Sequence, residues 1–465
     1  MLADLSAIVG NDHVRSGSER TYLEDATAIR GLRGEADAVV IPSTADEVAE
    51  VMKWCYQHNV PLIPRGGGTG YAGGAVPISG GVVLSLERLT RVREFDPLLW
   101  RIHVEAGITT GHIRQLAREN GLMFPPDPGA TEQSQIGGNI ATNAGGPHTF
   151  KYGVTGEWVT GIEAVVPPGE LIRIGGPIRK DQSGYDLKSL LIGSEGTLGI
   201  ITSAWLRLLP APEVVLPVVA FYETSREGSN ALMAVVGSGL IPAALEYLDR
   251  GAFALSSGSF PEGAPDSVGF VVIAEADGTK NEAQKLRNEL VEALKTENPI
   301  HLYTPETSNN IEELWRWRDG VSIAVGAARG GKYGEDIVVP LDRLGEVVDE
   351  IVEIGHRYDL PAVSWGHGGD GNIHANFLVD LTKPEEIARA QNAAEESFTL
   401  AIRMRGSISG EHGIGWLKRD QLQKQWGPTE LRLHNLIKSS FDPENLLNPG
   451  KKATPETSSN KPCSD

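Results

Sequence analysis

Four side chains able to bind a metal or transfer a proton lie in two glycine-rich stretches late in the chain. His367 and His374 are seven residues apart within residues 365–376, and Glu411 and His412 are adjacent within residues 409–415. Imidazole and carboxylate together suit a divalent transition metal that keeps positions open for a substrate. Histidines at this spacing also occur on ordinary surfaces, but the surrounding glycines let the backbone fold closely around one point. The pattern therefore favours a metal site.

Residues 64–74 form an earlier segment that is rich in consecutive glycines, beginning with Gly66, Gly67 and Gly68. The backbone N–H groups of such a run can point into one concavity, which suits a pyrophosphate. The run matches neither the dinucleotide fingerprint G-x-G-x-x-G nor a P-loop with its lysine. Taken alone, it fits a mobile surface turn equally well. Two further segments of this kind follow at residues 125–146 and 193–201.

Helices and strands must hold these segments in place. The expected elements are a helix capped by Ser43 or Thr44 and a strand within residues 42–64, strands at 82–86, 101–105, 269–275 and 332–340, and helices at 110–120 and 279–295. Gly121 is expected to adopt the left-handed conformation that ends the preceding helix. The composition changes at residues 209–212, which predicts a boundary followed by a second α+β domain.

The composition is that of a globular protein with no membrane span. Hydrophobic residues make up 40% and charged residues 22% of the chain, and no apolar run is long enough to cross a bilayer. With 42 basic and 61 acidic residues the net charge is −19, which disfavours nucleic acid and anionic membranes as partners. Residues 1–13 lack the basic flank and apolar core of an export signal, so we expect a cytoplasmic location.

The three glycine-rich segments resemble the FAD domain of the vanillyl-alcohol oxidase and p-cresol methylhydroxylase superfamily over about residues 35–210. The resemblance implies that the first segment holds the FAD pyrophosphate, the second passes beside the isoalloxazine and the third closes on the adenosine half. The implied contacts are Arg65, Gly66, Gly67, Gly68, Thr69, Gly70, Gly73, Pro128, Thr131, Ser134, Gly137, Gly138, Ala141, Thr142, Gly145, Glu195, Gly199 and Ile200.

The later segments extend the resemblance to about residues 20–452. The pattern His-x-Gly-Asp-Gly-Asn-x-His, then Gly-Glu-His-Gly and the closing residues 448–451, is similar to that of glycolate oxidase flavoprotein subunits, D-lactate dehydrogenases and D-2-hydroxyglutarate dehydrogenases. The resemblance implies oxidation of a small (R)-2-hydroxy acid. It assigns the metal to His367, His374 and Glu411, the catalytic base to His412, and a flavin contact in the last segment to Asn448.

The fold implied is α+β. It comprises a p-cresol methylhydroxylase-type FAD-binding domain of two subdomains (residues 1–210) and an α+β cap, or substrate, domain that carries the metal site (211–440). A C-terminal segment (441–452) returns to the flavin, and a disordered tail (453–465) follows it.

The chemistry agrees with these residue types. Oxidation of a 2-hydroxy acid removes the hydroxyl proton and passes the α-hydrogen to flavin N5 as hydride. A divalent metal (zinc, manganese or iron) stabilises the developing alkoxide. A histidine with an ordinary pKa of about 6.5 can accept the proton at physiological pH.

An anionic substrate also needs a cation in this acidic chain. The resemblance implies Arg318, whose guanidinium fork suits a carboxylate, while Arg316 is expected on a solvated helix face. Asn376 follows the D-2-hydroxyglutarate pattern, but Gly334 stands where that pattern has a lysine. Lys332 lies two residues away on the same strand face and either replaces it or is a surface lysine. We therefore expect glycolate or D-lactate, with D-2-hydroxyglutarate as the alternative.

The electrons must leave through another molecule. Cys55 and Cys463 are the only cysteines, too few for an iron–sulfur cluster, and no nicotinamide fingerprint follows a strand. We expect the electron acceptor to be an electron-transfer flavoprotein, a quinone or iron–sulfur partner subunits. Such partner subunits could bring the chain to a membrane. The sequence is also compatible with a homodimer. The rival readings are a non-redox ether-lipid synthase, which lacks this metal signature, and a non-catalytic subunit, which would not need the four side chains.

We predict that acid precipitation releases the flavin from the polypeptide. The first glycine-rich segment contains no histidine and no neighbouring cysteine, and His148, near the second segment, is expected on the surface. We therefore expect the FAD to be bound non-covalently. Yellow colour that stays with the precipitated chain would contradict this prediction.

Overall fold

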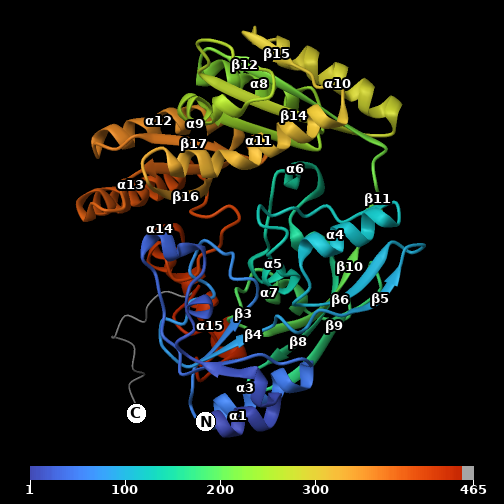
Figure 1. The fold of residues 1–465 in the computed structure, drawn as a ribbon, viewed down its shortest axis with the longest axis vertical. Helices are drawn as coiled ribbons and strands as arrows, with labels where there is room; N and C mark the ends of the chain where they lie inside the picture. The colour runs from blue at the N-terminus through green and yellow to red at the C-terminus, as the bar shows by residue number, and fades with distance from the viewer. Residues whose placement is uncertain (453–465) are drawn as a thin grey trace.

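The computed structural model describes residues 1–452 and has two parts, which lie one above the other in Figure 1. The lower part contains two sheets and the last residues of the described chain. The upper part contains one larger sheet with helices on both faces. Helices and strands are mixed in both parts, which confirms the expected α+β class.

The first sheet of the lower part has the strand order β1-β2-β4-β3, and β2, β4 and β3 run parallel. Its elements are β1 (Val14–Ser16), β2 (Ala38–Val40), β3 (Leu62–Arg65) and β4 (Val82–Ser85), with helices α1 (Leu2–Val9), α2 (Arg20–Leu23) and α3 (Ala45–Gln57). Helix α3 makes the crossover that parallel strands require, and the Thr44 side chain caps it. The first glycine-rich segment begins where β3 ends.

The second sheet is antiparallel, with the order β5-β6-β10-β8-β9. Its strands are β5 (Val92–Asp96), β6 (Arg101–Glu105), β8 (Val159–Val166), β9 (Glu170–Gly175) and β10 (Ile200–Arg207), and β7 (Leu122–Met123) pairs with β11 (Leu209–Pro210). The helices here are α4 (Thr110–Glu119), α5 (Ile136–Thr142), α6 (Thr149–Tyr152) and α7 (Leu187–Leu191). The second glycine-rich segment forms α5, and the third leads into β10.

The upper sheet is antiparallel, with seven strands in the order β15-β12-β14-β13-β17-β18-β16. The strands are β12 (Val214–Tyr222), β13 (Ala244–Asp249), β14 (Phe270–Gly278), β15 (His301–Tyr303), β16 (Lys332–Val338), β17 (Ala362–Gly366) and β18 (Asn372–Leu378). The helices are α8 (Ser225–Gly237), α9 (Arg250–Ser256), α10 (Lys280–Lys295), α11 (Ser308–Ala327), α12 (Leu344–Arg357) and α13 (Pro384–Arg403). Helices α8, α10, α12 and α13 cover one face, and α9 and α11 cover the other.

The chain finally returns to the lower part through α14 (Leu422–Gln425) and α15 (Pro428–Phe441). Leu447 forms a parallel bridge with Leu62 of β3, and the two leucines belong to the same core. The residue limits 210, 440 and 452 of the domain division stay predictions. The tail expected to be disordered, residues 453–465, lies outside the described residues. Among the helices of residues 1–452, none is long and apolar enough to cross a membrane.

Candidate active site

The three side chains assigned to a metal lie together. One ligand atom from each of His367, His374 and Glu411 lies within 4.8 Å of the other two. The Nε2 atoms of His367 and His374 are 3.3 and 3.4 Å from Glu411 Oε1. Two imidazoles and one carboxylate are a donor set that fits a divalent transition metal.

A tight hairpin brings the two histidines to one point. His367 follows β17 directly, and His374 is the third residue of β18. Between them, Gly371 has φ +68°, and a Cβ there would lie 2.0 Å from the carbonyl oxygen of Val339. Only glycine fits this turn.

Glu246, a buried residue of β13, contacts the ring nitrogen of His367 that faces away from Glu411. Its Oε1 lies 2.7 Å from His367 Nδ1. A ring that donates Nδ1–H to a carboxylate keeps a fixed orientation and leaves Nε2 for a metal. Burial keeps the pKa of His374 well below its usual value, which favours the neutral form that a metal ligand needs. Burial acts in the same direction on His367, but Glu246 and Glu411 hold the pKa of that imidazole well above its usual value. Sequence reasoning missed Glu246; its one signal is a carboxylate inside the apolar strand Ala244–Asp249.

Arg318 lies beside this cluster, and its guanidinium contacts Glu246. The residue is 6% exposed, and its Nε donates to Glu246 Oε2 at 2.9 Å. Arg318 is thus one side chain removed from His367. Arg316, on the same helix, is exposed as expected.

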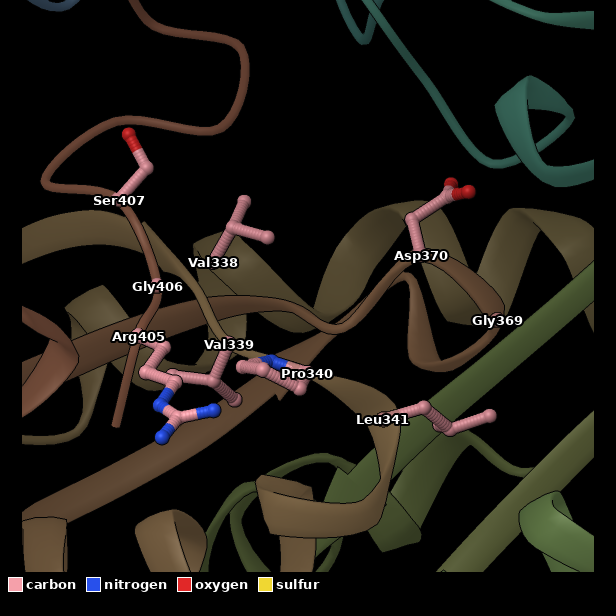
Figure 2. Close-up of a pocket in the computed structure, with 9 residues that line it drawn as sticks. All are labelled: Val338, Val339, Pro340, Leu341, Gly369, Asp370, Arg405, Gly406 and Ser407. Carbon is pink, nitrogen blue, oxygen red and sulfur yellow. The ribbon is translucent and has the colours of Figure 1, made fainter.

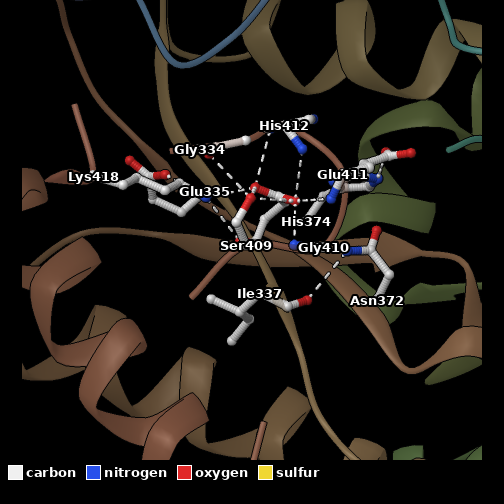
Figure 3. A network of polar contacts seen from close by, with 12 residues as sticks. Gly334, Glu335, Ile337, Asn372, His374, Ser409, Gly410, Glu411, His412 and Lys418 are labelled. Atoms are coloured by element: carbon white, nitrogen blue, oxygen red, sulfur yellow. Dashed lines mark hydrogen bonds and ion pairs between the residues drawn. The ribbon is translucent and has the colours of Figure 1, made fainter. Parts of the chain in front are cut away.

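The loop that carries Glu411 and His412 is held by the buried carboxylate of Asp336 on β16. Asp336 Oδ2 accepts the backbone N–H groups of Gly410, Glu411 and His412 at 2.7, 2.7 and 3.1 Å. Lys418 donates to Oδ1 at 2.5 Å, and Figure 3 shows this lysine on one side of the loop and His374 on the other. Burial opposes ionisation of Asp336, but His412 and Lys418 hold its pKa well below the usual value. Neither Asp336 nor Lys418 is among the site residues predicted from the sequence.

His412 lies between the metal cluster, here the side chains of His367, His374 and Glu411, and a cavity that the glycine-rich segments line. Its ring stacks on His374 at 5.4 Å and on Tyr71 at 4.7 Å between centroids. Its Nδ1 is 3.4 Å from Asp336 Oδ1. Because Nδ1 faces a carboxylate, Nε2 is the ring atom left to accept a proton.

This cavity is lined by all three glycine-rich segments and by His412. Thirteen of the predicted FAD contacts line it: Arg65, Gly66, Gly67, Gly68, Thr69, Gly70, Gly137, Gly138, Ala141, Thr142, Glu195, Gly199 and Ile200. Asp25, Gln135 and Asn139 also line the cavity. They are not among the FAD contacts predicted from the sequence. Asp25 lies outside the three glycine-rich segments, so no sequence pattern marks it as a contact.

The remaining predicted contacts do not line the cavity: Gly73, Pro128, Thr131, Ser134, Gly145 and Asn448. Asn448 Nδ2 donates to the carbonyl oxygens of Gly74 and Glu195 at 3.0 and 2.9 Å, which joins two of the lining segments. A Cβ on Gly145 would lie 2.8 Å from Glu411 Oε2, so this glycine adjoins the metal cluster.

The residues around this cavity fit FAD. A Cβ on Gly67 would lie 2.2 Å from the carbonyl oxygen of Gln133, and Gly68 has φ +68°, so both positions need glycine. Gln135 Oε1 and Asp25 Oδ2 are buried there without a hydrogen-bond partner among the described residues. Bare backbone and unpaired polar atoms are what a bound polar cofactor would complement.

His148 was predicted to lie on the surface, and this prediction is wrong. Its Nδ1 contacts Asp127 Oδ2, and its Nε2 lies 3.0 Å from Glu275 Oε1 on β14 of the upper part. The indole N–H of Trp315 donates to the other oxygen of Glu275 at 2.6 Å. His148 therefore joins the two parts of the protein.

Lys332 and Asn376 lie on neighbouring strands next to the metal cluster. In the ladder Gly334 pairs with Asn376, and Lys332 pairs with Leu378, so Lys332 and Gly334 share one strand face as expected. Lys332 Nζ donates to Ser322 Oγ at 2.6 Å and lies 4.5 Å from the ring centroid of Trp365. Burial lowers the pKa of Lys332 to about 7, with a smaller contribution from Arg30.

Another cavity, shown in Figure 2, is lined by residues that follow β16, by Gly369 and Asp370, and by Arg405, Gly406 and Ser407. Its charged members are Asp370 and Arg405, which lie on opposite sides of an apolar group. No histidine lines this cavity. We therefore place the chemistry at the junction of the metal cluster and the glycine-lined cavity.

Comparisons with known proteins agree with this geometry. A family model for the C-terminal domain of FAD linked oxidases matches residues 211–452. A model for an FAD binding domain matches residues 36–175. A solved structure of p-cresol methylhydroxylase with substrate bound has the same fold, with a TM-score of 0.80 at 20% identity over 97% of this chain and 96% of that one.

Three relatives match over most of their length. The chain is 34% identical to glycolate oxidase subunit GlcD of Bacillus subtilis (strain 168), covering 89% of this chain and 88% of that protein. It is 32% identical to a D-lactate dehydrogenase of Anaerostipes hadrus, covering 92% of each. It is 31% identical to a D-2-hydroxyglutarate dehydrogenase of Stutzerimonas stutzeri (strain A1501), covering 89% and 90%.

We predict that His367→Ala and His374→Ala lose bound metal and keep bound flavin. Each change removes one of three clustered donors, and neither residue lines the glycine-rich cavity. The measurement is metal content by elemental analysis beside the flavin absorbance of the purified variants. His356→Ala, an exposed histidine on α12, is the matched control. Unchanged metal content in both variants would remove these residues from the metal site.

Proposed function

The chain belongs to the FAD linked oxidases, and we propose that it oxidises a small (R)-2-hydroxy acid to the 2-oxo acid with FAD as hydride acceptor. The observation that carries the proposal is the position of His412, which lines the glycine-rich cavity and stacks on the metal-cluster residue His374. A substrate at this junction would meet a base, a metal and a flavin at once. The names of the three relatives support the substrate class.

We propose a separate role in this oxidation for each of the following residues. His412 Nε2 accepts the hydroxyl proton, and Asp336, opposite Nδ1, orients the ring and stabilises its protonated form. Tyr71 packs on the ring and limits its rotation. When bound, FAD supplies the hydride acceptor, and a divalent metal at His367, His374 and Glu411 supplies charge stabilisation at the substrate oxygen.

Asn376 and Lys332 are proposed to contact the rest of the substrate. Relatives named for glycolate, D-lactate and D-2-hydroxyglutarate match the chain at 34%, 32% and 31% identity, so the choice rests on the site. Gly334 stands where the D-2-hydroxyglutarate pattern has a lysine, and the ammonium of Lys332, the nearest replacement, already donates to Ser322 Oγ at 2.6 Å. We therefore propose glycolate or D-lactate. D-2-hydroxyglutarate is the second candidate, favoured by Asn376, which follows the pattern of that group.

The reduced flavin is proposed to pass its electrons to an external acceptor: an electron-transfer flavoprotein, a quinone or iron–sulfur partner subunits. Cys55 is buried, and two cysteines are too few for a cluster. Artificial dyes are therefore expected to reoxidise the flavin readily, and NAD is not. The non-redox synthase alternative is disfavoured because the resemblance to that enzyme does not include the His–His–Glu signature of His367, His374 and Glu411.

We predict that a panel of 2-hydroxy acids, mixed anaerobically with the enzyme, bleaches the flavin with one enantiomer only. Glycolate and D-lactate should bleach it fastest, D-2-hydroxyglutarate more slowly, and L-lactate not at all. Stopped-flow absorbance at the flavin band gives the rate for each acid. If no 2-hydroxy acid reduces a flavin that dithionite still bleaches, the proposed reaction is wrong.

We predict that His412→Ala and His412→Asn lower the rate of flavin reduction by substrate about 10²–10⁴-fold, the usual cost of losing a general base. Reduction by dithionite should be unchanged, because it needs no base. His301→Ala, whose partly exposed imidazole contacts Glu262 and stacks on Phe221, is the control and should react like the wild type. A His412 variant within a few-fold of wild type would mean that another group takes the proton.

A further inference from the structure

Two neighbouring loops at one end of the second sheet expose a group of apolar side chains, here called the apolar tip. Leu98, Leu99 and Trp100 form the turn between β5 and β6, with exposed fractions of 86%, 53% and 38%. Ile178 and Tyr185, in the loop between β9 and α7, are 51% and 97% exposed. Leucine and tryptophan side chains in such numbers at one turn cost free energy in water.

The two loops form one surface. The Arg179 guanidinium lies 5.9 Å from the ring centroid of Trp100, and Arg101 Nη1 donates to the carbonyl oxygen of Pro177 at 3.5 Å. In Figure 1 the β5–β6 hairpin extends to the edge of the lower part. The apolar tip is therefore a projection, not a groove.

The turn is held in place by specific contacts. Asp96 Oδ1 accepts the Leu99 N–H at 3.0 Å, and the carbonyl oxygen of Trp100 accepts the Leu208 N–H at 2.7 Å. Trp100 has φ +53°, which is uncommon for a bulky side chain. An ordered turn in an unfavourable conformation that still exposes two leucines points to a use for that exposure.

Charge around the apolar tip differs from that of the whole chain, whose net charge is −19. Within the described residues, Arg179 and Lys180 have no carboxylate within 4 Å. The nearby carboxylates of Asp181 and Asp186 keep their charge, but they are hydrogen-bonded to Ser183 and at the start of α7 and pair with neither cation. The two unpaired cations therefore border the apolar side chains.

We infer that the apolar tip docks on the surface of a lipid bilayer that contains anionic lipids. Leu98 and Leu99 would enter the acyl region, and Trp100 and Tyr185 would lie at the headgroup level, where amphipathic aromatic rings are favoured. Arg179 and Lys180 would meet lipid phosphates. The acidic field of the whole chain opposes approach to such a membrane, so binding depends on insertion of the apolar side chains.

A bilayer fits this surface better than a protein partner does. A projecting pair of loop ends needs a soft or concave counterpart, and a bilayer accepts a convex apolar tip without a matching pocket. The attachment leaves the active site free. The first residues of β10 line the glycine-rich cavity, while Leu208, just past its last residue, contacts Trp100. Six strand residues, 202–207, lie between Ile201 and Leu208, a separation of about 23 Å along the strand.

The test is vesicle flotation of the flavin-loaded protein with phosphatidylcholine vesicles, with and without phosphatidylglycerol. The wild type should float with the mixed vesicles, and the variant Leu98→Asp/Leu99→Asp should bind at least about tenfold more weakly. Arg179→Glu/Lys180→Glu should lose the preference for phosphatidylglycerol. Ile241→Asp, which changes a 58% exposed side chain of the upper part, is the matched control and should float like the wild type. Flavin absorbance shows that each variant is folded.

Three results would overturn the inference. The wild type could fail to float with either vesicle, or the double aspartate variant could float as well as the wild type. In the third, light scattering finds a wild-type dimer that the double aspartate variant converts to a monomer, which would assign the apolar tip to contact between two copies. None of these results bears on the proposed oxidation, because no residue of the apolar tip lines the flavin cavity.

Discussion

The buried carboxylate of Asp336 is the interaction on which the arrangement of the candidate site depends. It accepts three consecutive backbone N–H groups from the loop that carries Glu411 and His412, and it pairs with the buried ammonium of Lys418. Removing one partner of such a buried pair typically costs about 3–5 kcal/mol. The loop has no regular secondary structure of its own, so its position is set by this carboxylate.

The same loop is held from the other part of the protein by Glu195. This residue belongs to the third glycine-rich segment, and its oxygens accept the N–H groups of Ile414 and Gly415 at 2.9 and 2.6 Å. Asp336 belongs to β16 of the upper sheet. One loop is therefore fixed to both parts by two carboxylates, which explains how the side chains of His367, His374 and Glu411 keep their position relative to the glycine-lined cavity of the lower part.

Sequence analysis identified the residues whose neighbours carry a strong pattern. Glycine-rich motifs mark His367, His374, Glu411 and His412 and most of the residues that line the cavity. Glu246 and Asp336 have no such mark, because each lies in a buried strand and its partners lie far along the chain: 121 residues separate Glu246 from His367. His148 was placed on the surface for the same reason, since its contact with Glu275 spans 127 residues.

The most direct test of this account measures metal content and the rate of flavin reduction by substrate in Asp336→Asn. Asp442→Asn is the matched control, because Asp442 also binds two backbone N–H groups and a lysine in a buried position, but away from the site. Asp336→Asn is expected to bind FAD, lose metal and reduce its flavin about 10²-fold more slowly, since small displacements of catalytic groups have effects of this size. Asp442→Asn should keep metal and rate in the folded fraction. If Asp336→Asn keeps its metal and reduces flavin within a few-fold of wild type, Asp336 does not position the site.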